Sequence, residues 1–171
     1  MKSIIIYASR YGNTRHIAEA IAKGLQSQGT ARLLPMEDVS AATLAGVDLV
    51  VIGGPTEGHG MTEPVARFLD RMGAAAFQGR AVAAFDTRYR WPRWLSGAAS
   101  AAITRRLRRV GARVIAPPES FFVAGMPDAG AHGDPALESG ETERAATWAG
   151  SLADTAIERM ERMGRPLSHA V

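Results

Sequence analysis

Cysteine is absent from the 171-residue sequence. Disulfide bonds, thiolate catalysis and cysteine-held metal or iron–sulfur centres are therefore excluded. Apolar runs long enough to cross a bilayer are absent too, and residues 1–6 are too few for a secretory signal and lack a small-residue cleavage site. We expect a cytoplasmic protein without a membrane span, in which any redox chemistry would come from a bound cofactor.

Histidine is scarce, with four residues in the chain. His132 lies among Asp128 and Asp134, but this spacing is not that of metal ligands, so we assign no metal site. Arginine, in contrast, clusters between residues 105 and 113, where a nucleic-acid patch is one interpretation. The stretch has no interleaved aromatic residues for base stacking, which favours a solvated helix face, and we expect no nucleic-acid binding. The cluster consists of Arg105, Arg106, Arg108, Arg109 and Arg113.

Short apolar runs alternate along the chain with stretches of helical periodicity. The predicted strands cover residues 3–8, 31–36, 47–53, 80–86 and 113–123. The predicted helices cover residues 14–28, 40–45, 62–72, 96–110 and 141–163. The length fits a single domain over residues 1–163, with a Gly-, Pro- and Asp-rich loop at 124–140 and a loose tail at 164–171.

The alternation of five strands with helices predicts an α/β fold of the doubly wound class. Parallel strands need a helix or a similar length of chain between them, so the sheet is expected to be parallel and covered by helices on both faces. The nearly continuous apolar run over residues 47–52 is typical of a strand that is buried on both sides. Asp48 comes early enough in this run to lie at the edge of the sheet.

The loop between the first predicted strand and helix, residues 9–14, is a candidate anion site. Ligands of open α/β sheets bind outside the carboxyl ends of the strands. Gly12 permits a tight path, Ser9 and Thr14 offer hydroxyls, and the backbone N–H groups at the helix start can converge on a phosphate. The same residues also serve as helix N-caps without any ligand, and spacing alone does not separate the two interpretations. Neither a Gly-Lys-Ser/Thr ending nor a Gly-x-Gly-x-x-Gly pattern is present, which argues against a primary ATP or NAD site.

Three segments together resemble the flavodoxin family. The first, residues 5–14 followed by Ala18 and Ile21, is similar to the family's phosphate-loop signature. The other two are residues 53–60 after the third strand and residues 86–89 after the fourth. The resemblance implies a flavodoxin-like three-layer sandwich, with a five-stranded parallel sheet in the order 2-1-3-4-5, and one FMN bound non-covalently.

The resemblance also implies where FMN would bind. The first loop would hold the phosphate, and the two later segments would clasp the isoalloxazine ring, with Tyr89 at the position of the family's stacking tyrosine. Gly58 and Gly60 would let the backbone approach the ring and flip its peptides. The cofactor residues implied are Ser9, Arg10, Tyr11, Gly12, Asn13, Thr14, Pro55, Thr56, Glu57, Gly58, His59, Gly60, Asp86, Thr87, Arg88 and Tyr89.

Two departures from the family pattern affect the expected function. Tyr11 replaces the usual hydroxyl residue, which is more similar to the quinone reductase and flavodiiron branches than to carrier flavodoxins. The aromatic residue that often stacks from the second loop is missing, with Glu57 and His59 in that region. One face of the flavin would then be open to a substrate, or covered by His59 or by a partner subunit.

Cationic and aromatic residues alternate over residues 88–94. We interpret this stretch as a flavin clamp or substrate platform, with Arg88 near the reducible edge and Trp91 and Trp94 among the cofactor-binding residues. In the alternative, the tryptophans pack under the following helix and the arginines face solvent. Exposed tryptophans could also serve a homodimer interface.

The charge of the chain bears on the type of redox chemistry. The net charge is +3 and the isoelectric point is near 9.8, whereas carrier flavodoxins are generally acidic. An arginine near the flavin would favour two-electron reduction, which suggests an FMN-dependent oxidoreductase that passes electrons from NAD(P)H or a reductase to a quinone-like acceptor. His59 is the candidate catalytic proton donor. The alternatives are a carrier that shuttles single electrons between protein partners and a flavin-free binding module.

Overall fold

The computed structural model describes residues 1–92, 94, 97–124 and 135–164. The strands are β1 (Lys2–Tyr7), β2 (Thr30–Pro35), β3 (Leu49–Glu57), β4 (Gly60–Met61), β5 (Ala81–Tyr89), β6 (Arg113–Val114) and β7 (Glu119–Val123). The helices are α1 (Asn13–Gln26), α2 (Glu63–Met72), α4 (Ala99–Arg109) and α5 (Glu141–Arg162), with short 3₁₀ turns η1 (Met36–Asp38) and η2 (Ala42–Leu44).

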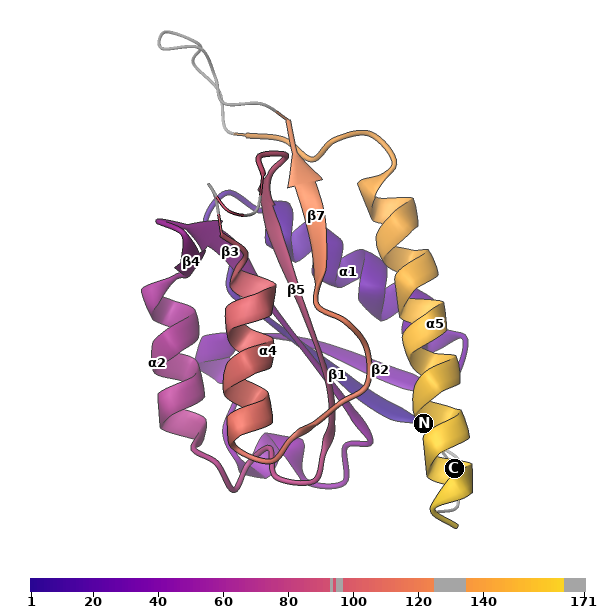
Figure 1. Cartoon of the computed structure of the whole chain (residues 1–171). Coiled ribbons are helices and arrows are strands. Elements are labelled where there is room, and N and C mark those ends of the chain that lie inside the picture. Colours follow the sequence, from indigo (N-terminus) through magenta and orange to yellow (C-terminus); the bar gives the residue numbers. More distant parts are fainter. Residues whose placement is uncertain (93, 95–96, 125–134, 165–171) are drawn as a thin grey trace, which may run out of the picture.

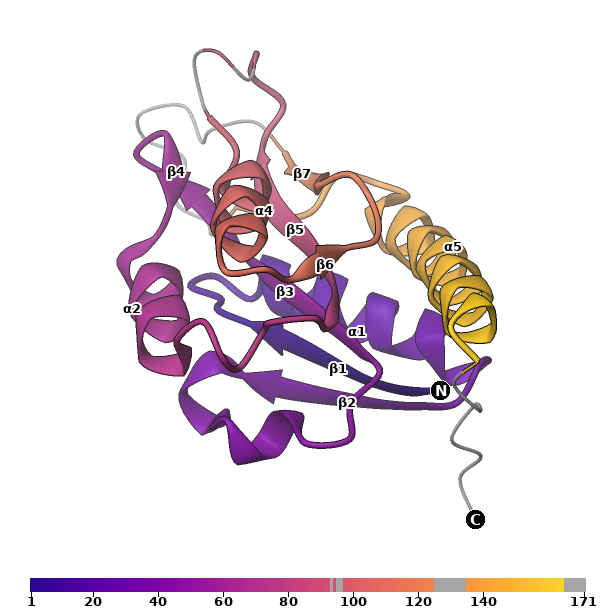
Figure 2. The ribbon, with the colours of Figure 1, turned by 60° about the horizontal axis from the view of Figure 1, so that its bottom comes forward.

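The sheet confirms the predicted parallel, doubly wound arrangement (Figures 1 and 2). Its order is β2-β1-β3-β5-β6, and β7 runs parallel to β5 beyond β6. This is the expected order 2-1-3-4-5, with the fifth strand divided into two pieces. The prediction of one continuous strand over residues 113–123 is therefore wrong. Pro117 and Pro118 lie at the break, and prolines have no N–H to donate to a strand ladder.

Strands β3 and β5 extend further than the sequence predicts. β5 continues to Tyr89 because β7 pairs with its last residues, from Phe85 onward. β3 continues to Glu57, where the short strand β4 folds back antiparallel onto it. Residues 55–57 and 87–89, expected in loops, therefore lie on strand ends and have a fixed direction for their side chains.

The prediction of a helix over residues 40–45 is also wrong, because only the 3₁₀ turn η2 forms there. The Ser40 N–H donates to the Thr43 hydroxyl at 3.0 Å. A local bond of this kind competes with helical hydrogen bonds and favours a turn.

Side chains of β1, β3 and β5 alternate between two apolar layers. Helices α1 and α5 cover one face of the sheet, and α2 and α4 cover the other (Figure 1). The run Leu49–Gly54 of β3 is buried throughout, as expected of a strand covered on both sides. Asp48 precedes this strand and accepts the Lys2 N–H at 2.8 Å. Within the described residues, no helix combines the length and apolar composition that a bilayer crossing requires.

Candidate functional site

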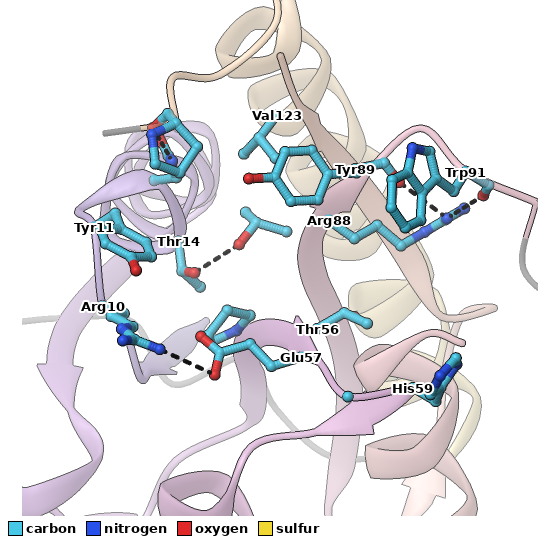
Figure 3. A pocket seen from close by; sticks show the side chains of 15 residues that line it. Arg10, Tyr11, Thr14, Thr56, Glu57, His59, Arg88, Tyr89, Trp91 and Val123 are labelled. Atoms are coloured by element: carbon cyan, nitrogen blue, oxygen red, sulfur yellow. Dashed lines mark hydrogen bonds and ion pairs between the residues drawn. The ribbon is translucent and has the colours of Figure 1, made fainter. Parts of the chain in front are cut away.

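A cavity of about 480 Å³ opens at the carboxyl ends of β3 and β5, beside the start of α1 (Figure 3). Small-molecule sites typically enclose about 300–1,000 Å³, and this end of a doubly wound sheet is where they occur. Most of the expected cofactor residues line the cavity. These are Arg10, Tyr11, Asn13, Thr14, Pro55, Thr56, Glu57, Gly58, His59, Thr87, Arg88, Tyr89 and Trp91.

The remaining expected residues lie outside the cavity lining. Ser9 and Gly12 line a neighbouring groove of about 760 Å³ on the other side of the first loop. Gly60 belongs to β4, and Asp86 is buried behind the cavity. Trp94 is 85% exposed, so it neither lines the cavity nor packs under a helix.

Sequence reasoning missed two residues that line the cavity, Val123 and Pro135. Val123 ends β7, and Pro135 comes from the segment expected only as a loop. The Pro135 carbonyl accepts a hydrogen bond from the Asn13 amide at 2.6 Å, which ties that segment to the first loop. Neither residue belongs to a motif, so the sequence carried no signal for them.

The start of α1 is built to receive an anion. Gly12 takes a left-handed conformation with φ 85°, and the helix begins at Asn13 with no side-chain cap and no acidic residue in its first turn. Free N–H groups and the helix dipole therefore both favour a negative group at this point. The Thr14 and Thr87 hydroxyls share a hydrogen bond of 2.7 Å and join the helix to β5. These features fit a phosphate.

An ion pair stands between the cavity and the neighbouring groove. Arg10 lies 3.6 Å from Glu57, and both residues line both spaces. The Arg10 guanidinium also lies 5.1 Å from the centre of the Tyr11 ring. Since both charged side chains are well exposed, the pair adds little stability but can move without disturbing the core.

The turn between β3 and β4 is held in a conformation that favours glycine. Gly58 and His59 are its two central residues, with φ 51° and 72°. Two positive φ angles are what a tight two-residue hairpin requires. His59 is the one non-glycine residue with positive φ in the described part of the chain, and it is one of the residues that line the cavity. Strain of this kind collects at functional sites.

Asp86 is a fully buried acid beside this turn. Its carboxylate accepts the Ser100 N–H at 2.8 Å and the Thr56 hydroxyl at 3.1 Å. The Thr56 hydroxyl in turn accepts the Ala99 N–H at 2.8 Å. Thr56 and Asp86 thus cap the start of α4 from two strands. Burial raises the pKa of Asp86, and the hydrogen bonds from Ser100, Ser120 and Thr56 oppose that rise.

The raised pKa predicts a pH-dependent effect of Asp86→Asn on stability. At a pH below the pKa of Asp86 in the unfolded chain, the carboxyl is neutral in both the folded and the unfolded protein. As pH rises from that pKa through the higher pKa of the folded protein, the unfolded chain gives up its proton more readily, so the folded protein loses stability. The neutral amide of the variant undergoes no such loss. The unfolding free energy of Asp86→Asn, relative to wild type, should therefore increase as pH is raised from about 4 to 8. Urea unfolding across this range measures it, and a constant or falling difference would contradict the burial effect.

The end of β5 supplies an aromatic and cationic wall. Tyr89 and Trp91 lie with their ring centres 6.0 Å apart and their planes tilted by 33° (Figure 3). Arg88 is only 7% exposed; its guanidinium donates to the Trp91 carbonyl at 2.8 Å and lies 5.1 Å from the Phe122 ring centre. A nearly buried cation thus stands in the cavity lining. No group of three or more metal-ligating side chains occurs among the described residues.

The fold and this site define a doubly wound α/β protein with a nucleotide-sized cavity beside an uncapped helix start. The Flavodoxin family model matches residues 5–148. A protein named Flavodoxin from Maridesulfovibrio salexigens is 33% identical over 135 residues, which cover 74% of this chain and 88% of that protein. The chain therefore belongs to the flavodoxin family, and it is an FMN-binding electron-transfer protein.

Solved structures agree with this fold. A flavodoxin from the domain Archaea has a TM-score of 0.74 at 23% identity, covering 92% of this chain and 99% of its own. The flavodiiron protein from Giardia intestinalis has a TM-score of 0.71 at 22% identity, covering 96% of this chain but 38% of its own. A WrbA-like flavodoxin from Agrobacterium tumefaciens has a TM-score of 0.67 at 21% identity, covering 92% and 98%.

Proposed function

We propose that this protein is a cytoplasmic FMN-dependent oxidoreductase that takes electrons from NAD(P)H or a reductase and passes them to a small flat acceptor such as a quinone. Arg88 carries the proposal. The residue is nearly buried and contributes to the cavity lining, its guanidinium donates to the Trp91 carbonyl beside the cavity, and charge interactions strengthen as water is excluded. A cation there favours the added negative charge of a fully reduced ring, which supports two-electron chemistry.

The residues of the cavity divide into two groups under this proposal. The start of α1, with Asn13 and Thr14, would bind the FMN phosphate. The ends of β3 and β5, with Thr56 and Tyr89, would hold the ring. Bound FMN supplies reversible transfer of one or two electrons. The protein residues bind it, orient it and control which molecules reach it.

Access to the cavity also supports a small acceptor. In the segment after β3, Glu57 stands in the region where an aromatic residue would shield the flavin ring. Its carboxylate pairs instead with Arg10. Tyr11 and Trp91 are each nearly half exposed at the cavity. Such half-exposed aromatic rings offer flat apolar surface to a planar molecule.

His59 is the proposed proton donor to that acceptor. His59 belongs to the cavity lining, although a glycine would fit its backbone conformation better. Keeping a side chain at a strained position indicates a use for it. Histidine is suited to proton transfer near neutral pH.

The proposal predicts steady turnover of NADH or NADPH with a benzoquinone, above the rate of free FMN at the same concentration. A potentiometric titration of the FMN-loaded protein should show one two-electron wave. In His59→Gln the wave should persist while quinone turnover falls, because only proton delivery is removed. Turnover no faster than free FMN would refute the oxidoreductase proposal.

An electron carrier between protein partners is the second candidate. The 33% identity to a protein named Flavodoxin favours it. It predicts two separate one-electron waves in the same titration and no quinone turnover. The two measurements together therefore separate the candidates.

A further inference from the structure

Gly97 lies two residues before α4 and packs against the turn between β3 and β4. A Cβ added at Gly97 would lie 2.1 Å from the carbonyl oxygen of His59, 2.5 Å from its carbonyl carbon and 3.0 Å from its Cα. A carbon–oxygen contact is normally about 3.3 Å or longer, so a side chain at position 97 has no room. Gly97 also has φ 66°, a conformation that favours glycine. Two independent requirements therefore place glycine here.

This contact acts on the backbone of a residue that is itself strained. His59 has φ 72°, and such conformations persist only where the surrounding structure imposes them. The rest of the turn is open, because a Cβ at Gly58 or Gly60 would meet no atom within 4 Å. The turn is therefore packed where His59 meets Gly97 and unconfined at the two glycines on either side of His59.

The start of α4 anchors Gly97. The backbone N–H groups of Ala99 and Ser100 donate to Thr56 and Asp86, both at 2.8 Å. Thr56 belongs to β3, and β4 lies beside α4 (Figure 1). The same end of α4 is thus tied to the strand that leads into the turn and presses on the turn itself. A helix fixed to the sheet, rather than the turn alone, sets the position of the turn.

The turn presents backbone donors toward the cavity region. Gly58 and His59 both line the cavity, and their N–H groups make no hydrogen bond with a described residue. These donors are available to a bound molecule. Hydrogen bonds to charged acceptors are roughly twice as strong as those between neutral groups. Donors at this turn would therefore stabilise a reduced, negatively charged flavin ring more than the oxidised ring.

We propose that Gly97 is a positioning residue for the FMN ring, which fixes the turn by packing against the His59 carbonyl. Gly97 does not line the cavity, so it acts only through the turn. The inference rests on the ring placement proposed above, at the ends of β3 and β5. A side chain at position 97 would displace the His59 peptide by about 1 Å or more, given the 2.1 Å approach. Hydrogen bonds from the turn to the ring would weaken at that displacement.

Gly97→Ala tests the proposal. The affinity for oxidised FMN should fall at least 10-fold, and the affinity for reduced FMN at least 100-fold, because the charged ring loses more from displaced donors. The additional factor of 10 lowers the two-electron midpoint potential by about 30 mV. Fluorescence titration with FMN and a potentiometric titration of the FMN-loaded protein measure the two effects.

Gly46→Ala is the matched control. Gly46 has φ 69°, close to that of Gly97, but a Cβ there would meet no atom within 4 Å. Both variants place a side chain at a positive φ, so both should melt below the wild type, and only Gly97→Ala should change the FMN potential. Equal shifts of potential in the two variants would overturn the positioning role.

Gly97→Asn keeps the test valid if the alanine variant folds poorly. Asparagine tolerates positive φ better than alanine but carries the same Cβ. It should shift the potential as alanine does, with a smaller loss in melting temperature. Adding His59→Gly to Gly97→Ala should recover part of the FMN affinity relative to His59→Gly alone, because glycine at position 59 adopts other backbone conformations readily.

Spectra of the FMN-free, ¹⁵N-labelled protein separate the steps of the argument. In Gly97→Ala the amide signals of residues 58–60 should move. Unmoved signals would show that Gly97 does not hold the turn, and moved signals with unchanged FMN affinity and potential would show that the ring does not bind there. Either result overturns the proposal. A lowered potential in Gly97→Ala, in a protein that reduces quinone no faster than free FMN, would support the positioning role while refuting the oxidoreductase.

Discussion

Asn13→Asp is expected to weaken FMN binding about 100-fold or more. Asn13 is the first residue of α1, at the helix start that we propose binds the phosphate. A carboxylate a few ångströms from a phosphate costs about 3 kcal/mol at an effective dielectric constant near 20, or about two orders of magnitude in affinity. The same charge interacts favourably with the helix dipole when no phosphate is bound. Binding and stability of the FMN-free protein should therefore respond differently.

Asn13→Ala is the matched control. Both variants lose the hydrogen bond to the Pro135 carbonyl, but only the aspartate adds a charge. Fluorescence titration with FMN should therefore show a modest loss for alanine and a much larger one for aspartate, whereas thermal melts without FMN should not place aspartate below alanine in the same proportion, because its charge interacts favourably with the helix dipole. Equal affinity of the two variants for FMN would mean that the phosphate does not bind at this helix start.

The geometry of the first loop and helix start, where we propose that the phosphate binds, could be predicted from the sequence because it is local. Residues 9–14 connect one strand to one helix, and Gly12 with the following helix start produces the cradle without help from distant segments. The order of strands was predictable for a similar reason, since each crossover carries its own helix. Local chemistry and the period of the apolar residues were sufficient for both.

The rest of the site depends on which strands pair, and the sequence does not state this. Residues 88 and 89 become part of β5 because β7 lies beside them, and residues 86 and 87 are paired with both β3 and β7. That pairing directs Asp86 toward α4 and Thr87 toward Thr14. Val123 and Pro135 reach the cavity through the same arrangement. Trp94 shows the reverse: its alternation with arginines suggested a ring contact, yet it is exposed to solvent.

Gly53→Ala is expected to destabilise the protein by about 3 kcal/mol or more. A Cβ at this position of β3 would lie 2.0–2.4 Å from three atoms of the Phe85 ring. The ring has little room to move, because Phe85 is fully buried and packs edge-on against Phe121 and Trp148, at 6.1 and 6.4 Å between ring centres. The melting temperature should fall by roughly 2–4 °C for each kcal/mol lost.

Gly150→Ala is the control for this substitution. A Cβ at Gly150 of α5 would meet no atom within 4 Å, and alanine is preferred to glycine inside a helix by about 0.5–1 kcal/mol. The same chemical change should therefore lower stability in β3 and raise it in α5.

Combining Gly53→Ala with Phe85→Leu should recover part of the loss, since the smaller side chain leaves the space that the ring occupied. A Gly53→Ala protein that melts with the wild type would show that β3 and β5 do not pack as described. Because the Gly53 carbonyl also accepts the Ala8 N–H at 3.0 Å, any displacement of β3 reaches the first loop, and FMN affinity should fall together with stability.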